Sequence, residues 1–152
     1  MMTGIVVRPV SESDFSEVCI FEQGSLECSY QAAVFVRQAM VLWPDSFLVA
    51  EQDGYLVGFL ICSKVTADPK SGWVLRVRVS QKMRRKGVAT EMMLHAHEVM
   101  QEAGVFHMML SCSPGNDGAL ALYSRMGYKT VCLEAGYFGI GEDRVILRKD
   151  LS

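Results

Sequence analysis

The sequence predicts a mixed α/β fold, because short β-rich runs alternate with segments of helical periodicity along the whole chain. The clearest stretch is 73–104, where the run WVLRVRVS gives way to a basic, glycine-containing turn and then to an amphipathic helix. The predicted order, β-α-α-β-β-β-α-β-α-β-β, implies a mixed sheet with helices on both faces. Because no repeat, linker or low-complexity tract interrupts this order, one domain over residues 1–152 is expected.

The first part of the chain is predicted to hold a strand, two helices and a hairpin. Ser11 and Asp14 have the spacing of a capping box, and Asp53-Gly54 is typical of a tight hairpin turn. The expected elements are a strand at 4–10, a helix after Ser11, a second helix at 29–42 that ends before Pro44, and the two hairpin runs 46–52 and 55–63.

The second part is predicted to alternate strands and helices. Gly104 and Gly127 are expected to end the two helices, and Ser113-Pro114 to begin the second of them. The expected elements are a loop at 67–72, a strand at 73–79, a helix at 88–103, a strand at 106–112, a helix at 114–126, and strands at 128–134 and 144–148.

Composition and charge narrow the function classes. Fifteen basic and seventeen acidic residues leave a net charge of −2, so a general nucleic-acid binder is not expected. No apolar run reaches the roughly 20 residues that cross a membrane, and no signal peptide is visible. The five scattered cysteines, odd in number and without metal-ligand spacing, indicate buried thiols in a reducing cytoplasm, and no metal site is expected. His95 and His97 lie two apart on a helix and are interpreted as surface residues.

The turn before the helix at 88–103 is a predicted phosphate site. The first N–H groups of a helix have no intrahelical acceptor, and the helix dipole favours negative charge there. Arg84, Arg85 and Lys86 add positive charge at the same place. The turn therefore suits a phosphate or a pyrophosphate.

Two motifs together resemble the GNAT superfamily of acyl-CoA-dependent N-acetyltransferases. The first is the acyl-CoA motif. It consists of an Arg or Gln, two residues of any type, a Gly, one further residue, and a Gly or Ala, and its matching residues here are Arg84, Gly87 and Ala89. The second is an Asn before an Ala-rich helix that carries Leu-Tyr and ends in Gly-Tyr; its matching residues are Asn116, Ala119, Ala121, Leu122, Tyr123, Gly127 and Tyr128. Gln81 and Met83 depart from the family, which often has Pro and an aromatic residue there.

The resemblance implies a mostly antiparallel sheet of six or seven strands with about four helices, and acetyl-CoA as co-substrate without a metal. Backbone N–H groups would cradle the pyrophosphate, and the residues implied in this contact are Arg84, Arg85, Lys86, Gly87, Val88, Ala89 and Thr90. Val77 and Val79 would pair with the pantetheine arm, with the Val79 N–H facing the thioester carbonyl.

Tyr123 is the residue that the family uses to meet the departing thiolate. Full proton transfer from a phenol of pKa about 10 to a thiolate near 8.5 costs about 2 kcal/mol, so a hydrogen bond is the simpler interpretation. Without the motif, Tyr123 would be read as a core tyrosine. Asn116 is expected either to contact the CoA arm or to cap the helix.

The segment near the C-terminus resembles the last hairpin of the Nα-acetyltransferases, particularly the ribosomal-protein-alanine type. There an aromatic pair before Gly-Glu-Asp holds the substrate's first residues, and Tyr137 and Phe138 match it. Ser111 stands where those enzymes usually have a Glu or His base, so Glu22 and Glu27 are candidate substitutes.

The acceptor remains open between three hypotheses. The first is the α-amine of a protein or peptide, of which about 10–15% is neutral at pH 7, against about 0.04% of a lysine amine. The second is a small amine such as an amino acid, a polyamine or an antibiotic, which a closed acidic pocket beside Tyr123 would favour. The third is a non-catalytic acyl-CoA-binding module. A monomer or a homodimer fits each of them.

Overall fold

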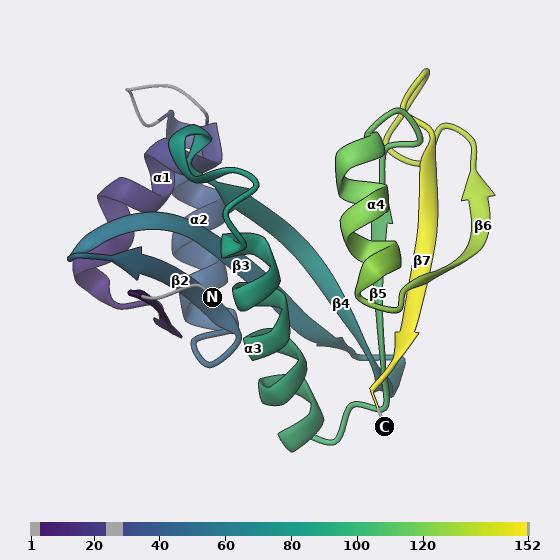
Figure 1. Ribbon diagram of the computed structural model, residues 1–152, viewed down its shortest axis with the longest axis horizontal. Helices are drawn as coiled ribbons and strands as arrows, with labels where there is room; N and C mark the ends of the chain where they lie inside the picture. The colour runs from purple at the N-terminus through teal and green to yellow at the C-terminus, as the bar shows by residue number, and fades with distance from the viewer. Residues whose placement is uncertain (1–3, 24–28, 152) are drawn as a thin grey trace. The chain divides into compact units, whose positions relative to one another are not determined.

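The computed structural model describes residues 4–23 and 29–151, and its order of helices and strands is the predicted one (Figure 1). The elements are β1 (Ile5–Pro9), η1 (Glu12–Asp14), α1 (Phe15–Gln23), α2 (Tyr30–Leu42), β2 (Phe47–Gln52), β3 (Tyr55–Val65), β4 (Asp68–Val79), η2 (Gln81–Met83), α3 (Val88–Glu102), β5 (His107–Cys112), α4 (Asp117–Arg125), β6 (Lys129–Glu134) and β7 (Arg144–Asp150).

The strands follow the order β1-β2-β3-β4-β5-β7-β6 in one seven-stranded sheet. The pairs β1–β2, β2–β3, β5–β7 and β6–β7 are antiparallel, whereas β4 and β5 are parallel. This is the mixed, mostly antiparallel sheet with four α-helices that the sequence predicts, so the predicted fold class is confirmed. The chain divides into two compact units, one of residues up to 63 with 75–99, the other of residues 64–74 with those from 100 onward.

The first unit has a core between α1, α2 and one face of its strands. Val18 and Cys19 of α1 and Val36 and Ala39 of α2 are fully or almost fully buried. They form one cluster with strand residues of a single face; these are Phe47 and Val49 of β2 and Phe59 and Ile61 of β3. Since side chains alternate along a strand, Gly58 belongs to the other face.

That other face is covered by α3. A Cβ at Gly58 would lie 3.0 Å from Met92 Cε and 3.4 Å from Val88 Cγ1, both on α3. Within the first unit, therefore, helices cover both faces of the strands, as predicted. The buried stripe of α3 includes His97, so the interpretation of His97 as a surface residue is wrong. His97 lies four residues after Met93 and therefore on the same side of the helix.

The second unit holds the start of β4, the strands β5, β6 and β7, and α4 (Figure 1). The strand β4 begins at Asp68, so the predicted loop at 67–72 is wrong. The segment contains residues that favour a turn, but hydrogen bonds to a distant part of the chain hold it as a strand. Ser71 pairs with His107, and the Lys70 carbonyl accepts from Phe106 N–H at 2.8 Å. Gly72 fits here because a Cβ would collide with Met108 Sδ.

The start of the second unit's helix also differs from the prediction. We expected Ser113-Pro114 to begin it, but α4 begins at Asp117. The cap is Asn116, whose Oδ1 accepts from Ala119 N–H at 3.1 Å. An asparagine three residues before a free helical N–H is a better cap than the serine, because Pro114 and Gly115 form a turn before the helix.

The capping box predicted at the start of the first helix is part of a charged network. The Asp14 carboxylate accepts from Ser11 N–H at 2.7 Å and from two Arg8 nitrogens at 2.8 and 3.0 Å. Arg8 also contacts Glu51 at 3.3 Å. Burial alone would raise the pKa of Asp14, but the hydrogen bonds from Arg8 and Ser11 outweigh it and hold the pKa below its ordinary value.

Replacing Asp14 should therefore destabilise the fold in a pH-dependent way. For Asp14→Asn we expect a loss of about 1–3 kcal/mol in the free energy of unfolding at pH 7. Because the pKa is lowered in the folded state, this contribution is complete above the unfolded value and is lost as the pH falls below about 4. Urea unfolding of both proteins between pH 7 and pH 3 measures it. The exposed Asp45→Asn change is the control, and an equal gap at pH 7 and pH 3 would contradict the assignment.

Candidate functional site

The turn between β4 and α3 has a backbone conformation that few residues adopt. Gly87 has φ of 85°, and Arg85, which is not a glycine, has φ of 63°. The left-handed region costs an L-residue about 1–2 kcal/mol, so the surrounding structure must hold Arg85 in it. The short helix η2 begins the turn, with Met83 N–H donating to the Ser80 carbonyl at 2.9 Å.

This turn leaves backbone donors at the start of α3. The first intrahelical bond runs from Glu91 N–H to the Gly87 carbonyl at 3.0 Å. The N–H groups of Val88, Ala89 and Thr90 therefore precede the ladder and have no acceptor inside the helix. Three such donors at the positive end of a 15-residue helix fit a phosphate oxygen.

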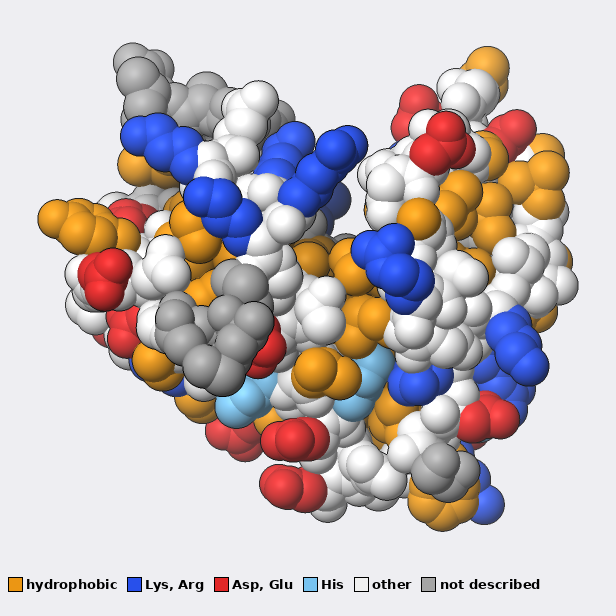
Figure 2. Space-filling view, in the orientation of Figure 1, with side chains coloured by type: hydrophobic (Ala, Val, Ile, Leu, Met, Phe, Trp, Pro, Cys, Tyr) orange, Lys and Arg blue, Asp and Glu red, His pale blue; other side chains and the backbone are white. Residues whose placement is uncertain are grey.

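Positive side chains surround the same turn. Lys82, Arg84, Arg85 and Lys86 are exposed, and no described carboxylate forms an ion pair with any of them. Figure 2 shows Lys and Arg side chains gathered over the N-terminal end of α3. The predicted pyrophosphate residues Arg84, Arg85, Lys86, Gly87, Val88, Ala89 and Thr90 are thus brought together. They form a cradle of backbone donors with positive charge beside it.

Val77 and Val79, the predicted partners of the pantetheine arm, lie in the last part of β4, directly before this turn. Both belong to the same unit as the turn. The pairing of β4 with β5 covers only Ser71–Trp73, whereas β4 continues to Val79.

Asn116 and Tyr123 belong to the second unit, at the two ends of α4. The Asn116 side chain caps the helix, which is one of the two roles expected for it. The Tyr123 ring packs edge-on against Tyr128 with centroids 5.8 Å apart. Burial raises the pKa of the Tyr123 phenol to about 12, with a smaller contribution from Cys112. The phenol therefore keeps its proton across the physiological range and is available as a hydrogen-bond donor.

Tyr137 and Phe138 lie on an ordered turn between β6 and β7. Gly136 N–H donates to Asp143 Oδ1 at 2.8 Å, and Phe138 N–H donates to the Glu142 carbonyl at 3.3 Å. The two rings contact each other with centroids 5.0 Å apart, yet they remain 43% and 62% exposed. The predicted acceptor residues are thus a fixed aromatic pair that faces solvent.

Of the two candidate base carboxylates, the structure describes only Glu22. Glu27 lies outside the described residues, whereas Glu22 lies in the last turn of α1. Glu22 Oε2 forms an ion pair with Arg76 at 2.7 Å. Ser111 is half-buried on β5, and its hydroxyl makes no hydrogen bond to a described residue. Sequence reasoning missed Arg76, although its position in a strand between Leu75 and Val77 marks it as a charge on a half-buried surface.

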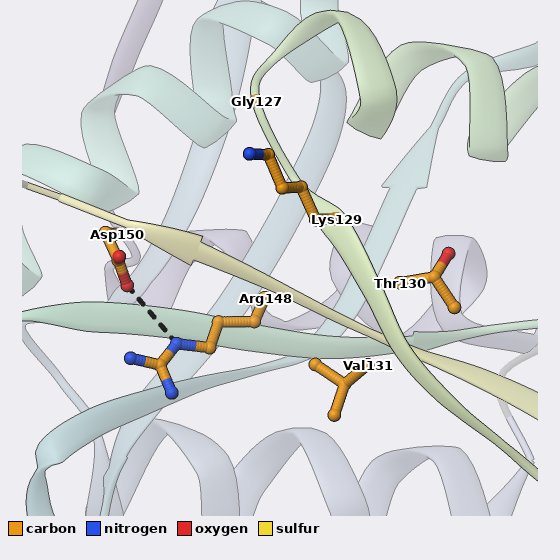
Figure 3. A pocket seen from close by; sticks show the side chains of 6 residues that line it. All are labelled: Gly127, Lys129, Thr130, Val131, Arg148 and Asp150. Atoms are coloured by element: carbon orange, nitrogen blue, oxygen red, sulfur yellow. Dashed lines mark hydrogen bonds and ion pairs between the residues drawn. The ribbon is translucent and has the colours of Figure 1, made fainter.

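A pocket of about 310 Å³ lies in the second unit, and Tyr123 is not among its lining residues (Figure 3). Its lining residues are Gly127, Lys129, Thr130, Val131, Arg148 and Asp150. Asp150 is paired with Arg148 at 3.2 Å, and the lining also holds Lys129, so the pocket is not acidic. It is therefore not the closed acidic pocket beside Tyr123 that a small-amine acceptor would favour.

Comparison with known proteins decides the family. The family model "Acetyltransferase (GNAT) family" matches residues 14–128, which contain both motifs. The chain belongs to the GNAT acetyltransferase family. The resemblance found in the sequence, and the prediction of an acetyltransferase, are confirmed by this match.

Relatives and solved structures agree with this family. The chain is 31% identical to N-alpha-acetyltransferase MAK3 of Arabidopsis thaliana over 67% of its own length and 55% of that protein. It is 27% identical to the N-terminal acetyltransferase A complex catalytic subunit ard1 of Schizosaccharomyces pombe, over 96% of this chain and 85% of ard1. A chain of the NatC complex, solved bound to Gag peptide and CoA, has a TM-score of 0.83 at 22% identity, covering 99% and 100% of the two chains.

Neither a metal site nor a membrane-spanning helix is found in the part of the chain that the structure describes. Over residues 4–23 and 29–151, no three His, Cys, Asp or Glu side chains are grouped so that they could hold a metal ion. None of the described helices is long and apolar enough to cross a membrane.

The turn at Gly87 offers a direct test of the cradle. Gly87→Ala places a side chain at φ of 85° and beside the free N–H groups, so we expect the affinity for acetyl-CoA to fall about 10-fold or more. Gly104→Ala is the matched control, because Gly104 has φ of 92° at the other end of α3 with open space around it. Calorimetric titration of both variants measures the affinity. An equal loss in both would mean that backbone strain, and not the cradle, is responsible.

Tyr123→Phe tests the phenol as a hydrogen-bond donor. We expect turnover to fall more than about threefold while the affinity for acetyl-CoA is unchanged, because only the departing thiolate loses its donor. The exposed Tyr55→Phe change is the control. Turnover within threefold of the unchanged protein, with acetyl-CoA still bound, would exclude Tyr123 as the partner of the thiolate.

Proposed function

We propose that the chain transfers the acetyl group of acetyl-CoA to the α-amine of a peptide or protein N-terminus. The observation that carries this proposal is the ordered turn that holds Tyr137 and Phe138 exposed to solvent. Large aromatic side chains fixed on a surface turn are typical of a surface that binds another chain. A second contact fixes the turn, since Arg144 lies 5.0 Å from the Phe138 ring.

The relatives support the same acceptor. The proteins from Arabidopsis thaliana and Schizosaccharomyces pombe are named as acetyltransferases of α-amines or N-termini, and the NatC structure holds a peptide. The exposed aromatic pair is a property of this chain itself.

The cradle residues bind and orient acetyl-CoA in this proposal. Val88, Ala89 and Thr90 would donate backbone N–H bonds to the pyrophosphate, with Arg84, Arg85 and Lys86 supplying charge. Val77 and Val79 would hold the pantetheine arm by main-chain bonds, and Val79 N–H would stabilise the developing oxyanion. Acetyl-CoA supplies an activated thioester, so no protein nucleophile is needed.

In the proposed reaction the amine is the nucleophile, and Tyr123 stabilises the departing thiolate. The amine attacks the thioester carbonyl, the carbon–sulfur bond breaks, and the amine loses a proton. With a phenol pKa of about 12, full proton transfer to a thiolate near 8.5 costs about 5 kcal/mol, so Tyr123 donates a hydrogen bond. Ser111 cannot accept the amine's proton. An α-amine tolerates this, because a tenth or more of it is already neutral at pH 7.

The acceptor preference can be measured by CoA release with a panel of amines. We expect release with short peptides that have a free N-terminus, and release at least about 100-fold slower with Nα-blocked lysine peptides, as the neutral fractions require. Release only with free amino acids or polyamines would move the chain to a small-amine acceptor. Binding of acetyl-CoA with no release across the panel would leave a binding module.

The pH dependence distinguishes an α-amine from a lysine acceptor in the same assay. For a free N-terminus, kcat/KM should rise with pH and level off above about pH 8, where the α-amine has lost its proton. Tyr123 keeps its proton below about pH 11, so it causes no fall in this range. A rate that still increases tenfold per pH unit at pH 9 would contradict an α-amine acceptor.

A further inference from the structure

The pocket of about 310 Å³ in the second unit is lined by two cations that lie directly opposite each other. In the antiparallel pairing of β6 with β7, Lys129 is the partner of Arg148, and both side chains line the pocket (Figure 3). Residues in such positions have Cβ atoms about 4.5–5.5 Å apart, and like charges there destabilise a sheet. The pairing of Lys129 with Arg148 is therefore unfavourable unless a negative charge comes between them.

A neighbouring carboxylate compensates only one of these cations. Arg148 Nε donates to Asp150 Oδ1 at 3.2 Å, and Arg148 NH2 lies 3.5 Å from His107 Nδ1, a weak contact in which arginine is the donor. Arg148 NH1 makes no hydrogen bond to a described residue. Lys129 forms no ion pair with a described carboxylate. The lining thus carries two positive charges against one negative charge, and each cation still has an N–H to donate.

The pocket also has an apolar wall and room for more than a simple ion. Val131 lines it and is 55% exposed. The register of β6 with β7 shifts between Thr130 and Cys132, so Val131 is an extra residue in β6. Bulges of this kind re-aim a side chain and are frequent beside functional sites. At about 30 Å³ for each water molecule, the volume of 310 Å³ exceeds what a bare phosphate or carboxylate would fill.

We propose that this pocket binds a small organic anion, which is a carboxylate or a phosphate ester with a short apolar group. The anionic oxygens accept hydrogen bonds from Lys129 Nζ and Arg148 NH1, and the apolar group contacts Val131. Asp150 stays on Arg148 Nε and keeps the guanidinium oriented. The site is separate from the backbone donors at the start of α3, which belong to the first unit.

The test locates the bound anion from the shifts of backbone amide signals in NMR titrations with three probes. The carboxylate 3-methylbutanoate and the ester isobutyl phosphate carry the two anionic groups, and 3-methylbutanamide has the shape of the first without its charge. The amides of Gly127, Thr130 and Val131 report on the pocket. The amides at the start of α3 report on the predicted pyrophosphate site, so binding at the two places is distinguished.

We expect saturable shifts at the pocket amides with at least one of the two anions and no shift with the neutral amide. Lys129→Gln should lower the affinity about 10-fold or more, as for the loss of a charged hydrogen-bond donor. Arg125→Gln is the matched control, because Arg125 is an exposed cation of the same unit that does not line the pocket. It should keep the affinity within about twofold, since salt screens a charge that does not touch the ligand.

The stability of the protein without any ligand gives an independent readout. Lys129→Glu places opposite charges in the cross-strand pair, so at low ionic strength its urea midpoint should exceed that of the unchanged protein. Added salt should reduce this difference, because it screens charges on exposed side chains. The same variant should lose the anion, and its higher midpoint verifies that it is folded.

Three results of the titrations would overturn the inference. They are no shift at the pocket amides with either anion, equal shifts with the neutral amide, and unchanged affinity in Lys129→Gln. Shifts confined to the start of α3 belong to the first of these, because they would mean that anions bind only at the pyrophosphate site. A urea midpoint of Lys129→Glu equal to that of the unchanged protein would also overturn it, since the two cations would then not oppose each other.

Discussion

The turn between β4 and α3 is the constraint on which the candidate site depends. Arg85 and Gly87 must both adopt positive φ, and this conformation leaves the N–H groups of Val88, Ala89 and Thr90 outside the helical ladder. Through Met92 and Val88, α3 packs against Gly58 of β3, so the start of the helix lies against the strands of the same unit. The donors for the pyrophosphate directly follow the strand that would carry the pantetheine arm, within that unit.

In the proposed reaction, binding of the pyrophosphate and stabilisation of the thiolate depend on different interactions. The cradle uses backbone dipoles and exposed cations, which attract an anion and need little burial. Tyr123 acts the other way, since its burial raises the phenol pKa to about 12 and keeps the proton on oxygen. A donor that does not ionise suits a thiolate leaving group, which needs stabilisation but not a proton at the moment it departs. This combination fits direct transfer without a protein nucleophile.

Most of the fold and the cradle could be predicted from the sequence, because their signals are local. The Asp53-Gly54 turn, the capping box of Ser11 and Asp14 and the basic turn each lie within a few residues of the structure they specify. The errors arose where distant contacts decide. Pairing with β5 places Ser71 and Gly72 in β4, where a loop was predicted, and the packing of α3 buries His97. The ion pair of Glu22 with Arg76 joins residues that are 54 positions apart in the sequence (76 − 22), so no local pattern predicts it.

The serine at position 111, which cannot act as a base, bears on the choice of acceptor. An α-amine needs little help to lose its proton near neutral pH, but it does need to be distinguished from the far more numerous lysine side chains. The neutral fractions achieve part of this, because at pH 7 about a tenth of an α-amine but only about 0.04% of a lysine amine is without its extra proton. The site would then obtain specificity from the ionisation of the acceptor and not from a protein base. On this view the serine is compatible with activity because the choice of acceptor has already supplied a reactive amine.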